Sequence, residues 1–316
     1  MIDRTVTTVI AAGRCTGCGL CVAACPWKTI SLIGEKAVVT GDRSLSCGHC
    51  AAVCPTEAIT VRAIDPAAEQ YATFAADPRW LPAGAFDTAQ LVRLMASRRS
   101  CRRFQVRPVE GALLEDLVRI GVTAPSGSNS QVWTFTLLPD RAAVEAFGER
   151  VARFFRRLNR MAENPVLRNG LKLLGKRELA DYYRNNYWSV SEALHEREKT
   201  GRDRLFHGAT AAIVVGTRPG GSTSKEDALL ASQNILLAAH AMGLGSCLIG
   251  YAVAVLSNDI RTKRFLGIPD DERVHAVIAL GYPDESYLRP AGRKGYLQRM
   301  FTAAPPSREV SRDRAS

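Results

Sequence analysis

One stretch of sequence, CTGCGLCVAACP at residues 15–26, decides how the N-terminal region folds. Its cysteines follow the spacing C-x2-C-x2-C-x3-C and are followed by proline, which is the pattern of bacterial iron–sulfur proteins. Cysteines on one tight loop can bind separate corners of an iron–sulfur cubane, whereas a zinc site usually takes two separated pairs of ligands. The stretch therefore predicts a cluster-binding domain rather than a zinc site or a disulfide framework.

A second copy of this motif lies 29 positions further along the chain, at residues 44–55. Cys47, Cys50 and Cys54 each match a cysteine of the first copy, and the glycine and proline positions also match. Such an internal duplication predicts two pseudo-symmetric halves. The match fails at one position, because Ser44 stands where the first copy has Cys15.

Residues 1–64 resemble a duplicated bacterial ferredoxin with two iron–sulfur clusters. The resemblance implies that the fourth cysteine of each motif binds the other cluster. The implied ligands of the first cluster, of the 4Fe-4S type, are Cys15, Cys18, Cys21 and Cys54. The implied ligands of the second, 4Fe-4S or 3Fe-4S, are Cys25, Cys47 and Cys50, with Ser44 at its fourth corner.

Several arrangements are open at that fourth corner. Ser44 could bind iron as an alkoxide, or three cysteines could hold a three-iron cluster. A labile fourth iron could instead carry water or a residue such as Asp42, or Ser44 could mark a site that has lost its ligand. The sequence leaves the number of irons in the second cluster open.

Length and composition indicate a globular protein of about two domains. The chain has 316 residues, of which 46% are apolar and 23% charged. No apolar run is long enough for a transmembrane helix and the N-terminus lacks a signal-peptide pattern, so we expect a cytoplasmic protein without a membrane partner. Residues 65–87 indicate a linker, and the polar residues 304–316 indicate a disordered tail.

Helix and strand signals alternate irregularly over residues 88–303. Asp87 is the expected N-cap of one helix, and a second helix is expected over residues 110–122. Ser224 and Asp227 are expected to form a capping box at the start of a long buried helix. Strands are expected from Val132, from Ala211, at SCLIG and at VHAVIALGY. The pattern predicts an α+β domain with a central mixed sheet flanked by helices.

Three segments of this second region occur in a characteristic order. They are RRSCRRF at 98–104, PSGSNSQVW at 125–133 and GLGSCLIG at 243–250, followed by Gly281-Tyr-Pro and Arg293-Lys294. Together they resemble the nitroreductase superfamily, which binds FMN at a homodimer interface. The whole chain resembles the nitroreductases that carry an N-terminal ferredoxin domain. Val132 departs from that family, which commonly has proline before this tryptophan.

The resemblance implies a flavin site with three parts. Guanidinium groups and hydroxyls suit a phosphate, and the residues implied there are Arg98, Arg99, Ser100, Arg102, Arg293 and Lys294. Loop residues with amides and hydroxyls suit the ribityl chain and the ring edge, and those implied are Pro125, Ser126, Asn129 and Gln131. The residues implied to present backbone to the isoalloxazine are Leu248, Ile249 and Gly250.

Each segment taken alone also has an ordinary structural interpretation. RRSCRRF can be a basic helix end, PSGSNSQ a loop and GLGSC a helix stop. Cys101 and Cys247 are expected to be bystanders, although the arginines around Cys101 would lower its pKa if the thiol were exposed. The histidines show no paired ligand spacing, so we expect structural roles for His195, His207, His240 and His275.

A basic, aromatic-rich helical insertion is expected at about residues 140–207. From Arg141 to Arg204 there are 15 Lys and Arg against nine Asp and Glu, which is over half of the excess behind the net charge of +11. Four interpretations are open: a lid over the flavin, a docking face for an acidic redox protein, a nucleic-acid surface or a solvated face. We favour the lid, and expect no nucleic-acid partner. The candidate pocket residues are Tyr182, Tyr183, Tyr187 and Trp188.

These patterns together predict an FMN-dependent oxidoreductase that receives electrons through its own clusters. Electrons would arrive singly, collect on the flavin and reduce a small organic acceptor such as a nitroaromatic, a quinone or an enone. We expect a ferredoxin- or flavodoxin-type donor, or NAD(P)H, and a homodimer. Two other classes remain open: an electron relay between proteins, and a redox-sensing regulator that binds nucleic acid.

Overall fold

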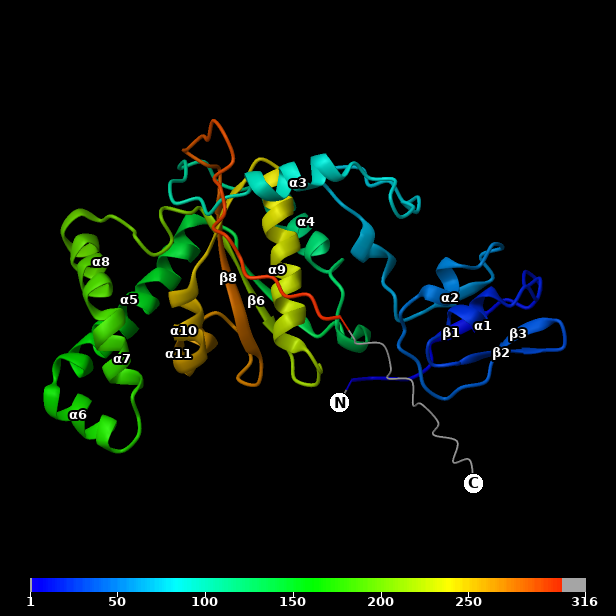
Figure 1. Ribbon diagram of the computed structural model, residues 1–316, viewed down its shortest axis with the longest axis horizontal. Helices are drawn as coiled ribbons and strands as arrows, with labels where there is room; N and C mark the ends of the chain where they lie inside the picture. The colour runs from blue at the N-terminus through cyan, green and yellow to red at the C-terminus, as the bar shows by residue number, and fades with distance from the viewer. Residues whose placement is uncertain (1, 303–316) are drawn as a thin grey trace, which may run out of the picture.

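The N-terminal domain, blue in Figure 1, has two short helices and two pairs of antiparallel strands. The computed structural model describes residues 2–302, so the tail expected at 304–316 lies outside the described residues. The elements of this domain are β1 (Thr8–Ile10), α1 (Leu20–Ala24), β2 (Ile30–Ile33), β3 (Lys36–Val39), α2 (His49–Ala52) and β4 (Ile59–Val61). Gly19 before α1 and Gly48 before α2 have φ angles of 76° and 74°, so both copies of the motif turn in the same way.

The segment expected to be a linker is held on the second domain by a buried carboxylate. Asp116, on α4 (Gly111–Gly121), is fully buried and accepts hydrogen bonds from the backbone N–H groups of Ala72 and Thr73 and from the Thr73 hydroxyl. Burial raises the pKa of Asp116, but the hydrogen bonds outweigh burial and hold the pKa below its ordinary value. The segment is therefore anchored near its middle.

The second domain is a four-stranded sheet between layers of helices (Figure 1). Its remaining elements are η1 (Pro66–Glu69, in the linker), α3 (Thr88–Ser97), η2 (Gly127–Asn129), β5 (Trp133–Leu138), α5 (Arg141–Glu163), α6 (Pro165–Leu173), α7 (Glu178–Asn185), α8 (Tyr187–Thr200), β6 (Ala211–Thr217), α9 (Ser224–Ala241), β7 (Gly245–Leu248), α10 (Gly250–Asn258), α11 (Ile260–Phe265) and β8 (Arg273–Gly281). The strand order is β5-β6-β8-β7 with every pair antiparallel, and the one parallel pairing in the described residues of this domain is an isolated bridge between Ser100 and Ser246 of β7. None of the helices in residues 2–302 is long and apolar enough to cross a membrane.

Strand β6 is buried on both faces because helices cover the sheet on both sides. Ala212 and Val214 belong to the core that α5 and α10 share with the sheet. Ala211, Ile213 and Val215 point the other way, into the core formed with α4 and α9. Alternation along the strand therefore supplies both cores. Helix α9 packs across the sheet, as its nearly uniform apolar sequence predicted.

The expected capping box at Ser224 is wrong. Helix α9 does begin at Ser224, but Thr223 is its N-cap and no side chain caps the helix. The Asp227 carboxylate accepts hydrogen bonds from the Thr223 hydroxyl, the Gly127 N–H and the Ser130 hydroxyl. The Asp227 carboxylate therefore binds donors of the loop before β5 and the Thr223 hydroxyl instead of capping the helix. Partly buried donors need hydrogen-bond acceptors as much as the N–H groups at a helix end do.

Candidate functional site

The first cluster site is a small cavity in the N-terminal domain. The thiols that line it are Cys15, Cys18, Cys21 and Cys54, the set that the ferredoxin resemblance implies. The Cys15 thiol accepts a hydrogen bond from the Ala37 N–H, and the N–H groups of Ala37 and Gly17 lower the pKa of Cys15. Because the thiolate is the form that binds iron, this loop suits a cluster ligand.

The second cluster site is a matching cavity whose lining includes Cys25, Cys47, Cys50 and Ser44. Ser44 is buried, and its hydroxyl accepts a hydrogen bond from the N–H of Ser46, two residues further on. In the first copy of the motif the Cys15 thiol faces the N–H of Gly17, also two residues further on. The Ser44 hydroxyl thus occupies the place of the missing thiol. Asp42, the alternative donor, is exposed and does not line the cavity.

In residues 2–302, the cysteine cavities included, no group of three or more His, Cys, Asp or Glu side chains is arranged to hold one metal ion. The thiolates of an iron–sulfur cubane each bind a different iron, so they surround a larger space than the ligands of one ion do.

Arginines gather without a carboxylate partner at the end of α3. Burial and the nearby guanidinium groups of Arg99 and Arg293 lower the pKa of Arg98. No ion pair forms at these three arginines in the described part of the chain. The backbone of Ser246 pairs with that of Ser100 in an isolated β-bridge, and the Ser246 hydroxyl is buried without a hydrogen-bond partner in residues 2–302. The clustered arginines fit a phosphate group.

A cavity of about 940 Å³ lies between α10 and the helices of the basic insertion. Four of the residues implied for flavin binding line this cavity: Leu248, Ile249, Gly250 and Arg102. The insertion supplies the aromatic wall, with Phe154, Phe155 and Tyr182. Its size and apolar lining suit a small organic ligand. The sixth residue implied for the phosphate, Lys294, is exposed in the segment after β8.

Of the four candidate pocket residues, the structure places one at this cavity. The hydroxyl of Tyr182 donates to Asn159 Oδ1 at 2.5 Å, and burial raises the pKa of Tyr182. The other three lie elsewhere: Tyr183 under the guanidinium of Arg168, Tyr187 bonded to Glu163, and Trp188 70% exposed.

The loop at residues 125–131 lies far from the arginines, at the other end of α9. Its Gly127 N–H is bonded to Asp227 in the first turn of α9, whereas Cys101 is bonded to Ser246, just beyond the last turn. An 18-residue helix is about 27 Å long. One chain therefore does not bring the loop and the arginines to the same small ligand.

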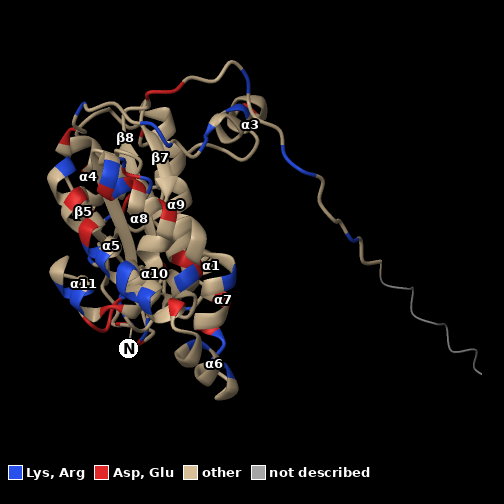
Figure 2. Ribbon diagram, turned by 90° about the vertical axis from the view of Figure 1, so that its left-hand side faces the viewer, with Lys and Arg blue, Asp and Glu red and all other residues tan. Residues whose placement is uncertain are grey.

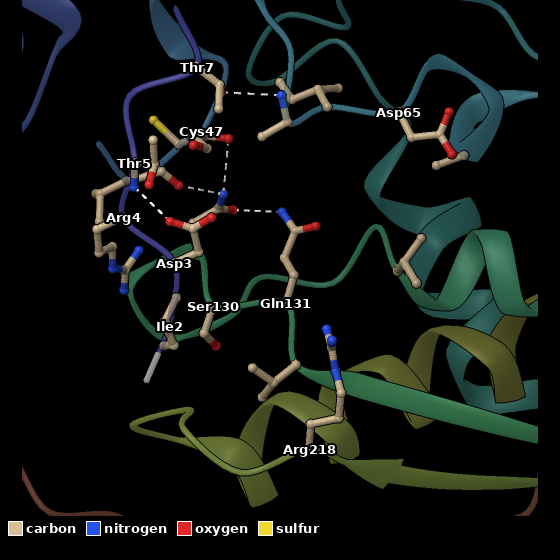
Figure 3. Close-up of a pocket in the computed structure, with 18 of the residues that line it drawn as sticks. Ile2, Asp3, Arg4, Thr5, Thr7, Cys47, Asp65, Ser130, Gln131 and Arg218 are labelled. Atoms are coloured by element: carbon tan, nitrogen blue, oxygen red, sulfur yellow. Dashed lines mark hydrogen bonds between the residues drawn. The ribbon is translucent and has the colours of Figure 1, made fainter. Parts of the chain in front are cut away.

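Instead, the loop contacts the N-terminal domain. The Asn129 side-chain amide donates to the backbone oxygens of Leu45 and Ser46 at 3.0 and 3.2 Å. The Gln131 amide donates to Asn129 Oδ1, and Figure 3 shows Gln131, Ser130 and Cys47 among the residues that line the cavity between the domains. Ser126 accepts from the Gln131 N–H, and Pro125 is exposed.

Two cysteines and one histidine near the large cavity were expected to have structural roles, and the structure confirms this only for the cysteines. Burial raises the pKa of the Cys101 thiol to about 11 and also raises the pKa of Cys247, so neither is an activated thiol. His207 was expected to be structural, yet it lines the cavity. Burial and the nearby Arg102 lower the pKa of His207. Its positive φ of 58° reflects a local turn that no sequence pattern here indicated.

The positive charge of the insertion is partly offset by ion pairs. Arg156 binds Glu149 and Glu198, and Arg204 binds Glu192 and Glu196. Figure 2 shows acidic residues interspersed with basic ones over the second domain. The insertion is thus a mixed-charge surface with an aromatic inner wall.

Comparison with known proteins assigns the second domain. Residues 95–282 match the model of the nitroreductase family, which is more than half of the chain, so the chain belongs to that family and is an oxidoreductase. Residues 14–58 match a 4Fe-4S dicluster domain. The resemblances seen in the sequence motifs are therefore confirmed for both domains.

Curated relatives match over the second domain at low identity. An iodotyrosine deiodinase of Thermotoga neapolitana is 26% identical over 199 residues, covering 62% of this chain and 89% of the relative. A 4-nitrobenzoate reductase of Pseudomonas putida is 27% identical over 212 residues, covering 61% and 85%. Among solved structures, a nitroreductase with bound FMN from Bacteroides fragilis is 21% identical with a TM-score of 0.49, covering 68% of this chain and 99% of that one.

Proposed function

We propose that this chain binds FMN and reduces a small aromatic or quinoid acceptor with electrons that pass through its own iron–sulfur clusters. The observation that carries the proposal is the group of Arg98, Arg99 and Arg293, which has no carboxylate partner in the described part of the chain. Such a group would hold the FMN phosphate. When bound, FMN supplies the two-electron chemistry, and the protein supplies position and electrostatics.

A homodimer would complete the flavin site. Loop 125–131 and the arginines lie at opposite ends of α9, so a second copy would have to bring its loop to the arginines of the first. Exposed apolar side chains support such a pairing. They are Leu91, Val92 and Met95 on α3, and Leu288, Tyr296, Leu297, Met300 and Phe301 after β8. An apolar surface of this kind is typical of an interface.

The acceptor would bind in the large cavity against its aromatic wall. Phe155 contacts Tyr182 and Tyr251 ring to ring, with centroids 6.2 and 5.4 Å apart, so the wall is rigid enough to hold a flat ring. Lys176 also lines the cavity and would attract an acceptor that carries a negative group, whereas Arg204 is already paired with Glu192 and Glu196. The names of two relatives, acting on iodotyrosine and on nitrobenzoate, are consistent with an aromatic acceptor.

The N-terminal domain would supply electrons from a one-electron protein donor such as a ferredoxin or flavodoxin. We propose domains at 1–64 and 88–303, a 4Fe-4S cluster at Cys15, Cys18, Cys21 and Cys54, and a second cluster of three or four irons beside Ser44. All cysteines of the described chain are free, which suits a reducing compartment such as the cytoplasm.

The test is an anaerobic panel of acceptors mixed with the dithionite-reduced holoprotein, with flavin absorbance as the readout. Rapid reoxidation by some aromatic or quinoid acceptors, with the product identified, would support the proposal. Reoxidation by redox proteins but by no small acceptor would favour the electron relay instead. The Arg98→Gln variant should lose FMN on gel filtration. The control is Arg168→Gln, which removes a guanidinium that stacks on Tyr183, and this variant should retain FMN.

A further inference from the structure

The two domains meet along a seam formed by residues 44–47 and 126–131. The Asn129 side-chain amide donates across the seam to the Leu45 and Ser46 carbonyls. The Arg4 guanidinium crosses it in the other direction, and its Nη1 donates to the Ser128 carbonyl at 2.8 Å. Figure 3 shows Arg4, Cys47, Ser130 and Gln131 around the cavity of about 700 Å³ that the seam encloses.

Unfavourable backbone conformations concentrate at the seam. Of the seven non-glycine residues with positive φ in residues 2–302, four lie here: Ser46, Ser128, Asn129 and Gln131. Such conformations persist where the surroundings hold them, and they are common at functional sites. In the duplicated motif Ser46 corresponds to Gly17, which has a similar φ of 70°. The second copy therefore has a serine where the first has glycine, and the Ser46 carbonyl is bound by Asn129.

The seam contacts one cluster site and not the other. Cys47 lines the cavity between the domains, together with Asn129 and Gln131. None of the four cysteines of the first cluster site lines it. Cys18, in that first site, is exposed at the surface. Asn129 is one of the residues implied for flavin binding, and Ser46 directly precedes the cluster ligand Cys47. The hydrogen bond from the Asn129 amide to the Ser46 carbonyl therefore connects the two sites directly.

We propose that the cluster beside Ser44 exchanges electrons with the flavin, that the cluster with the exposed Cys18 receives them from the donor, and that Asn129 is the positioning residue that keeps the domains in register. This order rests on the proposed function. Two molecules of a one-electron donor are oxidised for each acceptor, which takes up two electrons and two protons from water.

The experiment compares the full-length holoprotein with its Asn129→Ala and Arg4→Met variants. Domain contact is measured by hydrogen exchange of residues 44–47 and 126–131, and cluster environment by low-temperature EPR during a redox titration. Arg4→Met loses one interdomain hydrogen bond, which corresponds to about a fivefold loss in the equilibrium constant for domain docking, and Asn129→Ala loses two. Both segments should therefore exchange faster in both variants, and fastest in Asn129→Ala. The EPR signal of the second cluster should change, while that of the first should not.

Electron transfer is then followed by rapid mixing with a reduced one-electron donor. Cluster reduction should keep its rate, and the later bleaching of the flavin should slow by up to about fivefold in Arg4→Met and by more in Asn129→Ala. The Arg4→Met variant separates a loss of domain contact from a direct effect on FMN, because Arg4 is not among the residues implied for FMN binding. The matched control is Asn234→Ala, whose amide bonds to Thr123 within the second domain and should change none of these readouts.

The outcomes separate this inference from the proposed function. Unchanged exchange and flavin bleaching in both variants, or a change in the first cluster's signal alone, would overturn the order proposed here. If the reduced holoprotein passes electrons to no small acceptor, the proposed function fails, but the exchange and EPR results still decide whether the second cluster lies at the seam.

Discussion

At the scale of single residues, Ser44 has the clearest consequence. Its hydroxyl lies where the first copy of the motif has a thiol, with a backbone N–H two residues further on. We expect Ser44→Cys to bring the iron and acid-labile sulfide to about eight each per chain and to change the EPR signal of the second cluster. Asp42→Ala is the control and should leave both unchanged. An unaltered signal in Ser44→Cys would contradict the placement of Ser44 at the fourth corner.

His207 predicts a pH dependence of stability. Burial and Arg102 hold the pKa of His207 below its ordinary 6.5, so the unfolded chain binds this proton more readily than the folded one. Unfolding free energy should therefore fall as the pH drops below 6.5 towards the folded pKa. His207→Gln should flatten this part of the profile in urea unfolding at several pH values. His195→Gln, on the exposed side of α8, should keep the slope.

At the scale of elements, the start of α9 holds the loop before β5. The buried Asp227 carboxylate binds Gly127, Ser130 and Thr223 at 2.9 to 3.1 Å. Asp227→Asn should cost about 1–3 kcal/mol of unfolding free energy, because a buried donor loses its acceptor. Chemical denaturation measures the change, and hydrogen exchange should quicken at residues 126–131. Equal exchange in the variant and the parent would show that the loop is held by other contacts.

At the scale of the whole molecule, dimerisation and flavin binding should be lost together. Met95→Glu would place a charge on the exposed apolar face of α3. Sedimentation should show a shift from twice the chain mass to the single chain mass, and the protein should lose FMN at the same time. Val166→Glu, on the exposed face of α6, should change neither. A monomer that retains FMN would contradict a site completed by two copies.

Local sequence patterns predicted the features of the fold that depend on short-range spacing along the chain. The cysteine run and its repeat predicted both cluster cavities, and Asp87 does cap α3, with its carboxylate bonded to the N–H groups of Ala89 and Gln90. The predicted capping box at α9 was wrong, since two of the three donors to the Asp227 carboxylate, Gly127 and Ser130, come from a loop some hundred residues earlier. Spacing within a helix contains no information about such a partner.

The sequence by itself determined the kind of chemistry: which cysteines group, that Ser44 is the exception among them, and that the second domain belongs to the nitroreductase family. Only the tertiary structure decided which groups meet. It placed Tyr182 and His207 at the cavity, separated loop 125–131 from the arginines by the length of α9, and joined Asn129 to the loop of Cys47. The reason is physical: ligand types follow from residue chemistry, whereas their distances follow from how helices and sheet pack.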